Sequence, residues 1–250
     1  MDTEAFIRDG YVALRGAFDP QIAAACRDRI WAALRRRGVD RRDRATWPVL
    51  AEFGNLVGEP FAAAGTTPAL TAAYDELIGP GRWTRPVDVG GSVVVRFPSG
   101  DRANSGYHIE GSYHGASAGM VNIHSKARGL LALFLLTEIG PDDAPTRLMC
   151  GSHLAVPEFL APHGEVGTDS DADFWRPSAL CLPVAHATGR PGDVFLCHPF
   201  IVHTATWPHR GRTPRMIAQP AVHVRDGFAV DGSDPSPVAR AIAAGLALAD

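Results

Sequence analysis

The chain has 250 residues, of which 46% are hydrophobic and 20% charged, the balance of a folded globular protein and not of a disordered or fibrous one. Its formal net charge of −3 provides no field that would gather polyanions, so we expect no nucleic-acid partner. The longest apolar run, Gly129 to Leu136, is far too short to cross a bilayer, and we expect no membrane insertion. Because the chain begins with acidic residues and has no CxxC pair, we expect a cytoplasmic protein.

The first 90 residues are predicted to be mainly helical. Asp19 and Pro20 provide the cap and first turn of a helix that should end at Gly38. The apolar positions that share one face of this helix are Ile22, Cys26, Ile30 and Leu34. A second helix is predicted from Pro68 to Ile78, capped by Thr67.

From residue 91 to residue 225 the pattern changes to short β-rich runs separated by Gly, Pro and Asp. These runs are Val93–Phe97, Gly129–Ile139, Thr146–Met149, Asp193–Cys197 and Met216–Val224. Strands at this spacing, without intervening helices, indicate a sandwich or barrel and not a parallel βαβ sheet. We therefore predict a mainly β fold with flanking helices and a jelly-roll, cupin-like core.

The C-terminal stretch, residues 235–250, is predicted to return to helix. Ser236 is its expected cap and Pro237 its first turn, and the helix should pack outside the barrel. The polar stretch His163–Asp173 is interpreted as an exposed loop, with an active-site lid as the alternative. No composition break divides the chain, so residues 1–250 are predicted to form a single domain.

The strongest chemical signal is the pair His108 and Glu110, two residues apart in the run Tyr107-His108-Ile109-Glu110-Gly111. On an extended chain, residues two apart project to the same side and can bind one metal ion. An unrelated surface pair is the alternative, because a chain with ten histidines and 27 acidic residues can contain such a pair by chance.

A third ligand is expected from the apolar strand that follows Gly192-Asp193 and ends at His203. A histidine satisfied by hydrogen bonds at a strand end is the alternative for His203. His198 in the same run and His153 in Gly-Ser-His are expected to be structural, or to support the ligands without binding the metal.

Arg215 comes twelve residues after His203 and opens the last β-rich run. A strand turn would return its guanidinium beside the His203 strand, where it could bind a carboxylate through two parallel hydrogen bonds. Arg210 and Arg212 are alternative candidates for this carboxylate-binding role. We favour Arg215 because it leads directly into an apolar strand.

Taken together, these motifs resemble the phytanoyl-CoA dioxygenase-like branch of the iron and 2-oxoglutarate oxygenases, over roughly Phe6 to Val224. The motifs occur in family order: Asp9-Gly10-Tyr11-Val12, H-x-(D/E), Gly140 to Pro145 leading to Gly151-Ser152-His153, and G-D-x4-H-P-x3-H ending at His203. The resemblance implies a double-stranded β-helix, a variant of the jelly roll.

The resemblance also implies that His108, Glu110 and His203 bind Fe(II), and that Arg215 binds the distal carboxylate of 2-oxoglutarate, with O2 as oxidant. Two positions depart from the family pattern. Glu110 stands where most of this branch has Asp, and Ala205 stands where Ser is common. Thr204 or Thr206 could replace the hydroxyl that Ala205 lacks.

The resemblance implies C–H hydroxylation, desaturation or cyclisation coupled to conversion of 2-oxoglutarate to succinate, and we expect a role in specialised metabolism. The substrate is expected to be a small organic molecule. The candidate substrate-binding residues are Arg96, Tyr113, His114 and Trp207. A cupin-type metalloenzyme without 2-oxoglutarate and a non-catalytic ligand-binding jelly roll are the alternatives; substrate identity and oligomeric state are left open.

Overall fold

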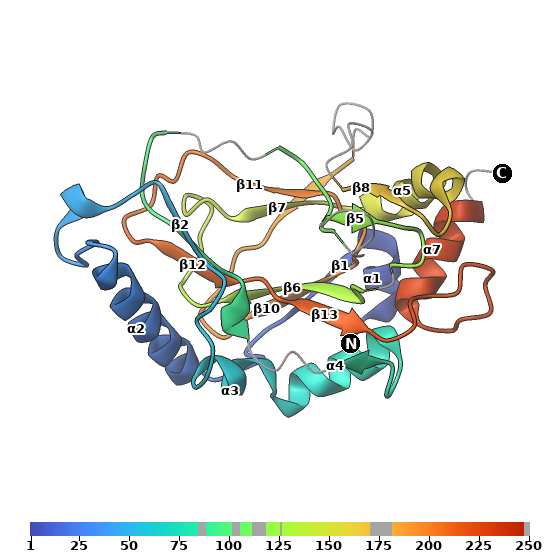
Figure 1. Cartoon of the computed structure of the whole chain (residues 1–250), viewed down its shortest axis with the longest axis horizontal. Coiled ribbons are helices and arrows are strands. Elements are labelled where there is room, and N and C mark those ends of the chain that lie inside the picture. Colours follow the sequence, from blue (N-terminus) through green and yellow to red (C-terminus); the bar gives the residue numbers. More distant parts are fainter. Residues whose placement is uncertain (85–88, 102–105, 112–118, 126, 171–181, 248–250) are drawn as a thin grey trace.

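A computed structural model describes the chain except for residues 85–88, 102–105, 112–118, 126, 171–181 and 248–250. Antiparallel sheets form its centre, and helices cover one side and one end (Figure 1). The structure is thus mainly β with flanking helices, as predicted.

The larger sheet has eight strands and takes its members from the whole length of the chain. Its main path runs β1-β10-β6-β12-β4-β2, and β13 pairs with both β6 and β3. The strands are β1 Tyr11–Leu14, β2 Leu50–Phe53, β3 Trp83–Thr84, β4 Val93–Arg96, β6 Leu130–Leu135, β10 Val194–Cys197, β12 Arg215–Ala218 and β13 Ala221–Val224. Strands from the N-terminal part therefore complete the same sheet as the predicted core.

A second sheet has three strands in the order β11-β7-β9, and a two-stranded ribbon pairs β5 with β8. These strands are β5 Met120–Val121, β7 Thr146–Met149, β8 Thr168–Asp169, β9 Val184–His186 and β11 His203–Ala205. One apolar cluster joins Leu148 of the smaller sheet to Leu133, Phe195 and Ile217 of the larger one. The two sheets thus pack face to face, as in a sandwich.

Helices cover the other face of the large sheet and one end of the molecule (Figure 1). The helices are α1 Thr3–Asp9, α2 Pro20–Arg36, α3 Phe61–Gly65, α4 Pro68–Ile78, α5 Ser152–Leu160 and α7 Pro237–Ala247, with short 3-10 turns η1 Arg44–Thr46, η2 Val89–Gly91 and η3 Ala161–His163. The Asp19 side chain accepts a hydrogen bond from the Gln21 amide (2.7 Å), and Thr67 caps α4 in the same way. The predicted caps are thus confirmed.

The predicted strands are found near their expected places, with two corrections: α5 lies in the region expected to have no helices, and one predicted run is divided. The run Met216–Val224 is two strands and not one, because Pro220 has no N–H to donate to a ladder and separates β12 from β13. The predicted loop His163–Asp173 contains the short strand β8, and its last three residues lie outside the described part. Within that part, no helix combines the length and apolarity needed to cross a bilayer.

Candidate metal centre

Two backbone segments place His108 and His203 directly opposite each other. His203 opens β11, and it forms an isolated antiparallel bridge with His108. The amide of each histidine donates to the carbonyl of the other, at N–O distances of 3.1 and 3.0 Å. Residues paired in this way project to the same face, so the imidazole rings lie side by side with centroids 4.5 Å apart.

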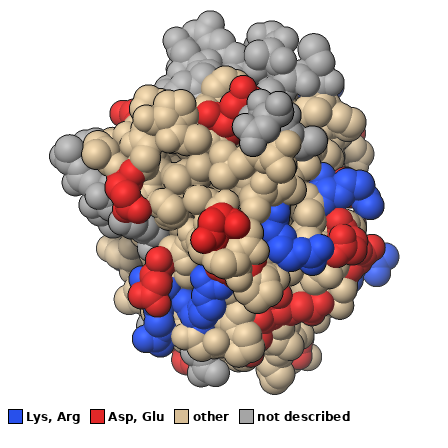
Figure 2. Space-filling view, turned by 90° about the vertical axis from the view of Figure 1, so that its right-hand side faces the viewer, with Lys and Arg blue, Asp and Glu red and all other residues tan. Residues whose placement is uncertain are grey.

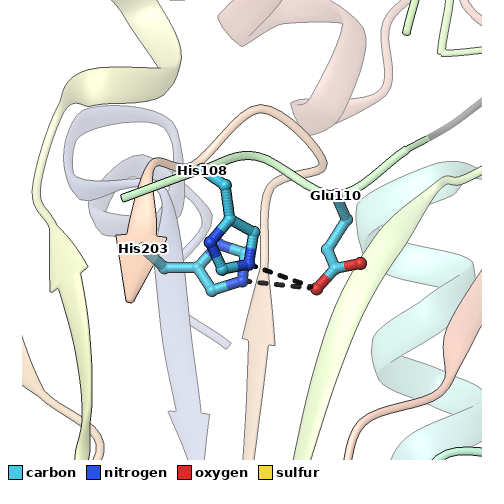
Figure 3. Close-up of side chains that lie close together, drawn as sticks. All are labelled: His108, Glu110 and His203. Carbon is cyan, nitrogen blue, oxygen red and sulfur yellow. Dashed lines mark ion pairs between the residues drawn. The ribbon is translucent and has the colours of Figure 1, made fainter. Parts of the chain in front are cut away.

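Glu110 completes the group that the sequence predicted. Its Oε1 lies 3.5 Å from His203 Nε2 and 3.8 Å from His108 Nε2 (Figure 3). All three candidate ligand atoms lie within 4.8 Å of one another. Metal–ligand bonds are about 2.0–2.2 Å long, so an ion fits between the carboxylate oxygen and either imidazole. Among the described residues, this is the one cluster of three or more such side chains that could hold an ion.

Hydrogen bonds on the far side of each ring prepare the two histidines for metal binding. His108 Nδ1 lies 3.0 Å from the Gly106 carbonyl oxygen, and His203 Nδ1 lies 3.0 Å from the Ile201 carbonyl oxygen. A carbonyl can only accept, so each Nδ1 carries the proton and donates. In the neutral form of either ring, the lone pair that could bind a metal is then on Nε2, the atom that faces Glu110.

Glu110 is held as a carboxylate. Burial alone would raise its pKa, but hydrogen bonding to His108 and His203 and the positive charge of Arg128 outweigh burial, and the pKa lies well below its usual range. Arg128 Nη2 lies 3.7 Å from Glu110 Oε2, and Arg128 Nε donates to the Gly111 carbonyl. Arg128 thus contacts the oxygen that faces away from the histidines. Its role was not predicted, since nothing in the local sequence links it to Glu110.

Arg215 lies inside the sandwich, and its predicted role in binding the co-substrate stays a prediction. It is 2% exposed, and its Nη2 donates to the hydroxyl of Thr146 on β7. Burial and the neighbouring charge of Arg96 lower the Arg215 pKa to about 9, so the guanidinium stays charged at neutral pH. Its Nε is buried without a hydrogen-bond partner. A buried, partly unsatisfied guanidinium is suited to an anionic ligand.

Thr146 is a site residue that the sequence did not single out. It lies directly opposite Ala205 in the ladder between β7 and β11, so the two side chains share a face. The family-like hydroxyl missing from Ala205 is thus present on the next strand. The one available signal was the position of Thr146 immediately after the Gly140 to Pro145 motif.

The predicted replacements for Ala205 lie elsewhere. Thr204 pairs with Arg147, and strand alternation places its side chain on the face opposite His203. Thr206 follows the strand, and its buried hydroxyl has no hydrogen-bond partner. The predicted role of both threonines in co-substrate binding stays a prediction.

The candidate substrate residues are only partly brought together. The Arg96 guanidinium lies over the Trp207 ring, 4.6 Å from its centroid. Tyr113 and His114 lie outside the described residues. His153 and His198 pack against each other, and each bonds through Nε2 to a backbone carbonyl. These contacts agree with the structural role expected of both, which stays a prediction.

Solved structures share this architecture. The epimerase SnoN, in complex with Fe3+, alpha ketoglutarate and nogalamycin RO, is 18% identical with a TM-score of 0.58, over 89% of this chain and 82% of that one. EctD from S. alaskensis, with 2-oxoglutarate and 5-hydroxyectoine, is 19% identical with a TM-score of 0.58, over 94% and 78%. HygX from Streptomyces hygroscopicus, with nickel, 2-oxoglutarate and hygromycin B, is 16% identical with a TM-score of 0.51, over 86% and 82%.

These likenesses establish the fold. At such identities the three structures show that the chain shares their architecture, and they assign no residue of it a role. No family model matches the sequence. No curated protein matches it either.

Proposed function

We propose that the chain is an Fe(II)- and 2-oxoglutarate-dependent oxygenase that acts on a small organic molecule. The observation that carries this proposal is the convergence of His108, Glu110 and His203 in a fold that also places the buried Arg215 in its interior. Two imidazoles and one carboxylate that leave neighbouring coordination positions open are characteristic of non-haem Fe(II) oxygenases.

The residues present fit Fe(II). The donor set contains two imidazoles whose Nδ1 atoms are bound to backbone carbonyls and a carboxylate that is held ionised, which are ligand types that Fe(II) takes. When bound, iron would supply the activation of O2. Two oxidations depend on this activation: that of 2-oxoglutarate to succinate and carbon dioxide, and that of the substrate at a C–H bond. His108, Glu110 and His203 would hold it through Nε2, a carboxylate oxygen and Nε2.

Arg215 supports 2-oxoglutarate as the co-substrate. Its buried guanidinium would bind the distal carboxylate, while the 2-oxo acid end would face the metal ligands. Thr146 is uncharged, but its hydroxyl accepts a hydrogen bond from Arg215 and so fixes the orientation of the guanidinium. The apolar residues Leu148 and Ile201 exclude water from the interior next to His203, which limits side reactions.

We assign the chain to the phytanoyl-CoA dioxygenase-like branch, with a double-stranded β-helix and a single domain over residues 1–250. The order of its motifs supports this assignment, and Glu110 in place of the usual Asp still reaches both histidines. Because the carboxylate is retained, we propose oxygenation and not halogenation, which needs a coordination position for chloride.

A small organic substrate is favoured over a polymer. On the face shown in Figure 2, acidic and basic side chains are interspersed and form no broad surface of one sign. The structural neighbours HygX and SnoN were solved with hygromycin B and nogalamycin RO bound, which are small molecules. We propose a cytoplasmic enzyme of specialised metabolism whose reaction is hydroxylation, desaturation or cyclisation.

The proposal is tested anaerobically with the metal-free protein. Adding Fe(II) and 2-oxoglutarate should produce the weak visible charge-transfer band of the chelated co-substrate. His203→Ala should abolish the band, and Arg215→Ala should require far more 2-oxoglutarate to reach it. A wild-type protein that binds Fe(II) but gives no band would favour the cupin-type alternative, and one that binds neither would favour the non-catalytic jelly roll.

A further inference from the structure

Arg96 and Arg215 form a pair of like charges inside the protein. They are directly opposite each other in the antiparallel ladder between β4 and β12. Their Cα atoms are thus about 4.5–5.5 Å apart, and both side chains project to the same face. Two positive side chains in this relationship repel each other, so the arrangement is unfavourable unless an anion lies between them.

Among the described residues, no carboxylate lies between these two guanidinium groups as an ion-pair partner. Within the described residues neither Arg96 nor Arg215 forms an ion pair, although ion pairs of other arginines are present. The acidic charge that acts on Arg96 belongs to Glu52, which is exposed on β2. The Nε and Nη1 of Arg96 and the Nε of Arg215 are buried, and no described residue forms a hydrogen bond with them. Three unsatisfied donors on two adjacent guanidinium groups indicate a binding site for an acidic group.

The position of Arg96 is held by Trp207. The guanidinium lies over the indole ring, 4.6 Å from the centroid, and Trp207 follows β11 closely, the strand that begins with His203. The chain beyond Trp207 is tied back to the loop after β4 by a bridge between Ser99 and His209, with N–O distances of 3.1 Å in both directions. The ring thus restricts Arg96 to a geometry that faces its neighbour on β12.

We propose that Arg96 is a second anchor for the co-substrate, so that the distal carboxylate of 2-oxoglutarate is bound by both Arg96 and Arg215. This inference rests on the proposed function. One carboxylate has two oxygens and about four lone-pair directions, enough to accept from both guanidinium groups. Arg96 thereby sets the preference for a 2-oxo acid that carries a distal carboxylate. In the sequence, Arg96 was predicted to bind the substrate, and the pairing with Arg215 changes that assignment.

The test measures binding and not turnover. Anaerobic Fe(II)-loaded protein is titrated with 2-oxoglutarate and with 2-oxopentanoate, which has the same chain length but a methyl group in place of the distal carboxylate. Arg96→Gln should weaken 2-oxoglutarate by about 10- to 100-fold, because charge-assisted hydrogen bonds are lost. It should leave the weak binding of 2-oxopentanoate unchanged. Arg96→Lys, which keeps the charge but not the fork, should lie between Arg96→Gln and wild type.

Arg147→Lys is the matched control. Arg147 is also partly buried, also has a buried Nε without a partner, and also lies over an aromatic ring, that of Tyr107 at 5.4 Å. Strand alternation places it on the face of β7 opposite Thr146, so the variant should leave binding of both 2-oxo acids unchanged. Iron affinity and the melting temperature of each variant establish that the site is intact.

Three outcomes would overturn the inference. In the first, Arg96→Gln binds 2-oxoglutarate as tightly as wild type while Arg215→Ala does not. In the second, it weakens both 2-oxo acids equally, which means that it distorts the site. In the third, Arg147→Lys has the same effect as Arg96→Lys. If wild-type protein fails to bind 2-oxoglutarate at all, it is the proposed function that fails, and the two failures are thus distinguishable.

Discussion

Thr146 and Ala205 face each other across the ladder between β7 and β11, and the hydroxyl of Thr146 receives the hydrogen bond of Arg215. The hydroxyl that position 205 lacks is therefore present on the neighbouring strand. The hydroxyl reaches the same guanidinium from the opposite position in the ladder. This pair of residues defines the first prediction.

Thr146→Val should weaken 2-oxoglutarate binding by about tenfold, because it removes a hydrogen bond to a charged group at constant shape. The dissociation constant is measured by anaerobic titration of the Fe(II) protein. Adding Ala205→Ser to Thr146→Val should recover part of the affinity. Thr204→Val is the comparison on the other face of β11; if it weakens binding and Thr146→Val does not, the prediction made from sequence is right and the structural one is wrong.

Glu110→Gln should lower metal affinity by more than about 100-fold, because a neutral amide replaces the one anionic ligand. Mutation of residues that only contact metal ligands already lowers metal affinity by about 10- to 100-fold. Affinity is measured by titration with Co(II), followed by its visible spectrum. Glu165→Gln is the matched control, because Glu165 also lies close to a histidine, 3.2 Å from His124, outside the proposed metal site. Equal losses in both variants would exclude Glu110 as a ligand.

Arg128→Gln should also weaken metal binding, by about 10- to 100-fold, although Arg128 is not a ligand. Removing its charge leaves Glu110 Oε2 without its cationic neighbour and raises the Glu110 pKa toward its usual range. The pH at which metal affinity is half-maximal should therefore move upward. Arg128→Lys keeps the charge and should retain most of the affinity; a pH profile identical to wild type in Arg128→Gln would contradict this role.

Stability should fall as the pH drops from about 6.5 toward 4. Burial lowers the pKa of His153 to about 4 and that of His198 well below its usual value, with the His153 charge adding to the effect on His198. Between these values the unfolded chain takes up protons that the native protein does not, so native stability is full above pH 6.5 and declines below it. The expected slope is about 1.4 kcal/mol per pH unit for each histidine.

Urea denaturation at a series of pH values measures this slope. His153→Gln should be less stable at pH 7 but should show a shallower decline on acidification. His186→Gln, at an exposed histidine on β9, should leave the decline unchanged. A decline that is the same in all three proteins would assign the acid sensitivity to other groups.

The elements with local signals were predictable. The helix that begins at Pro20 and the helix Pro68–Ile78 have a capping side chain before the first turn, and both caps are present. The glycine in the run Asp9-Gly10 is explained by its backbone conformation and by a close neighbour. Gly10 ends α1 at φ 85°, and a Cβ there would lie 2.6 Å from His153 Nδ1, so glycine is required.

The elements and contacts that depend on distant partners were not predictable. β1 and β2 have four residues each and exist because they pair with β10 and β4. α5 contains Pro157, which reads as a break in a helix. The contacts of Arg128 with Glu110 and of Thr146 with Arg215 join segments whose spacing has no readable pattern.

The reciprocal backbone bridge between His108 and His203 has a consequence for folding. The two ligands lie far apart in the sequence, and two amide hydrogen bonds join their backbones. An ion coordinated by both side chains would act as a cross-link between these segments and would stabilise the native state in proportion to the logarithm of its concentration. The catalytic metal would thereby also stabilise the fold by linking the His108 segment to β11 at one edge of the sandwich.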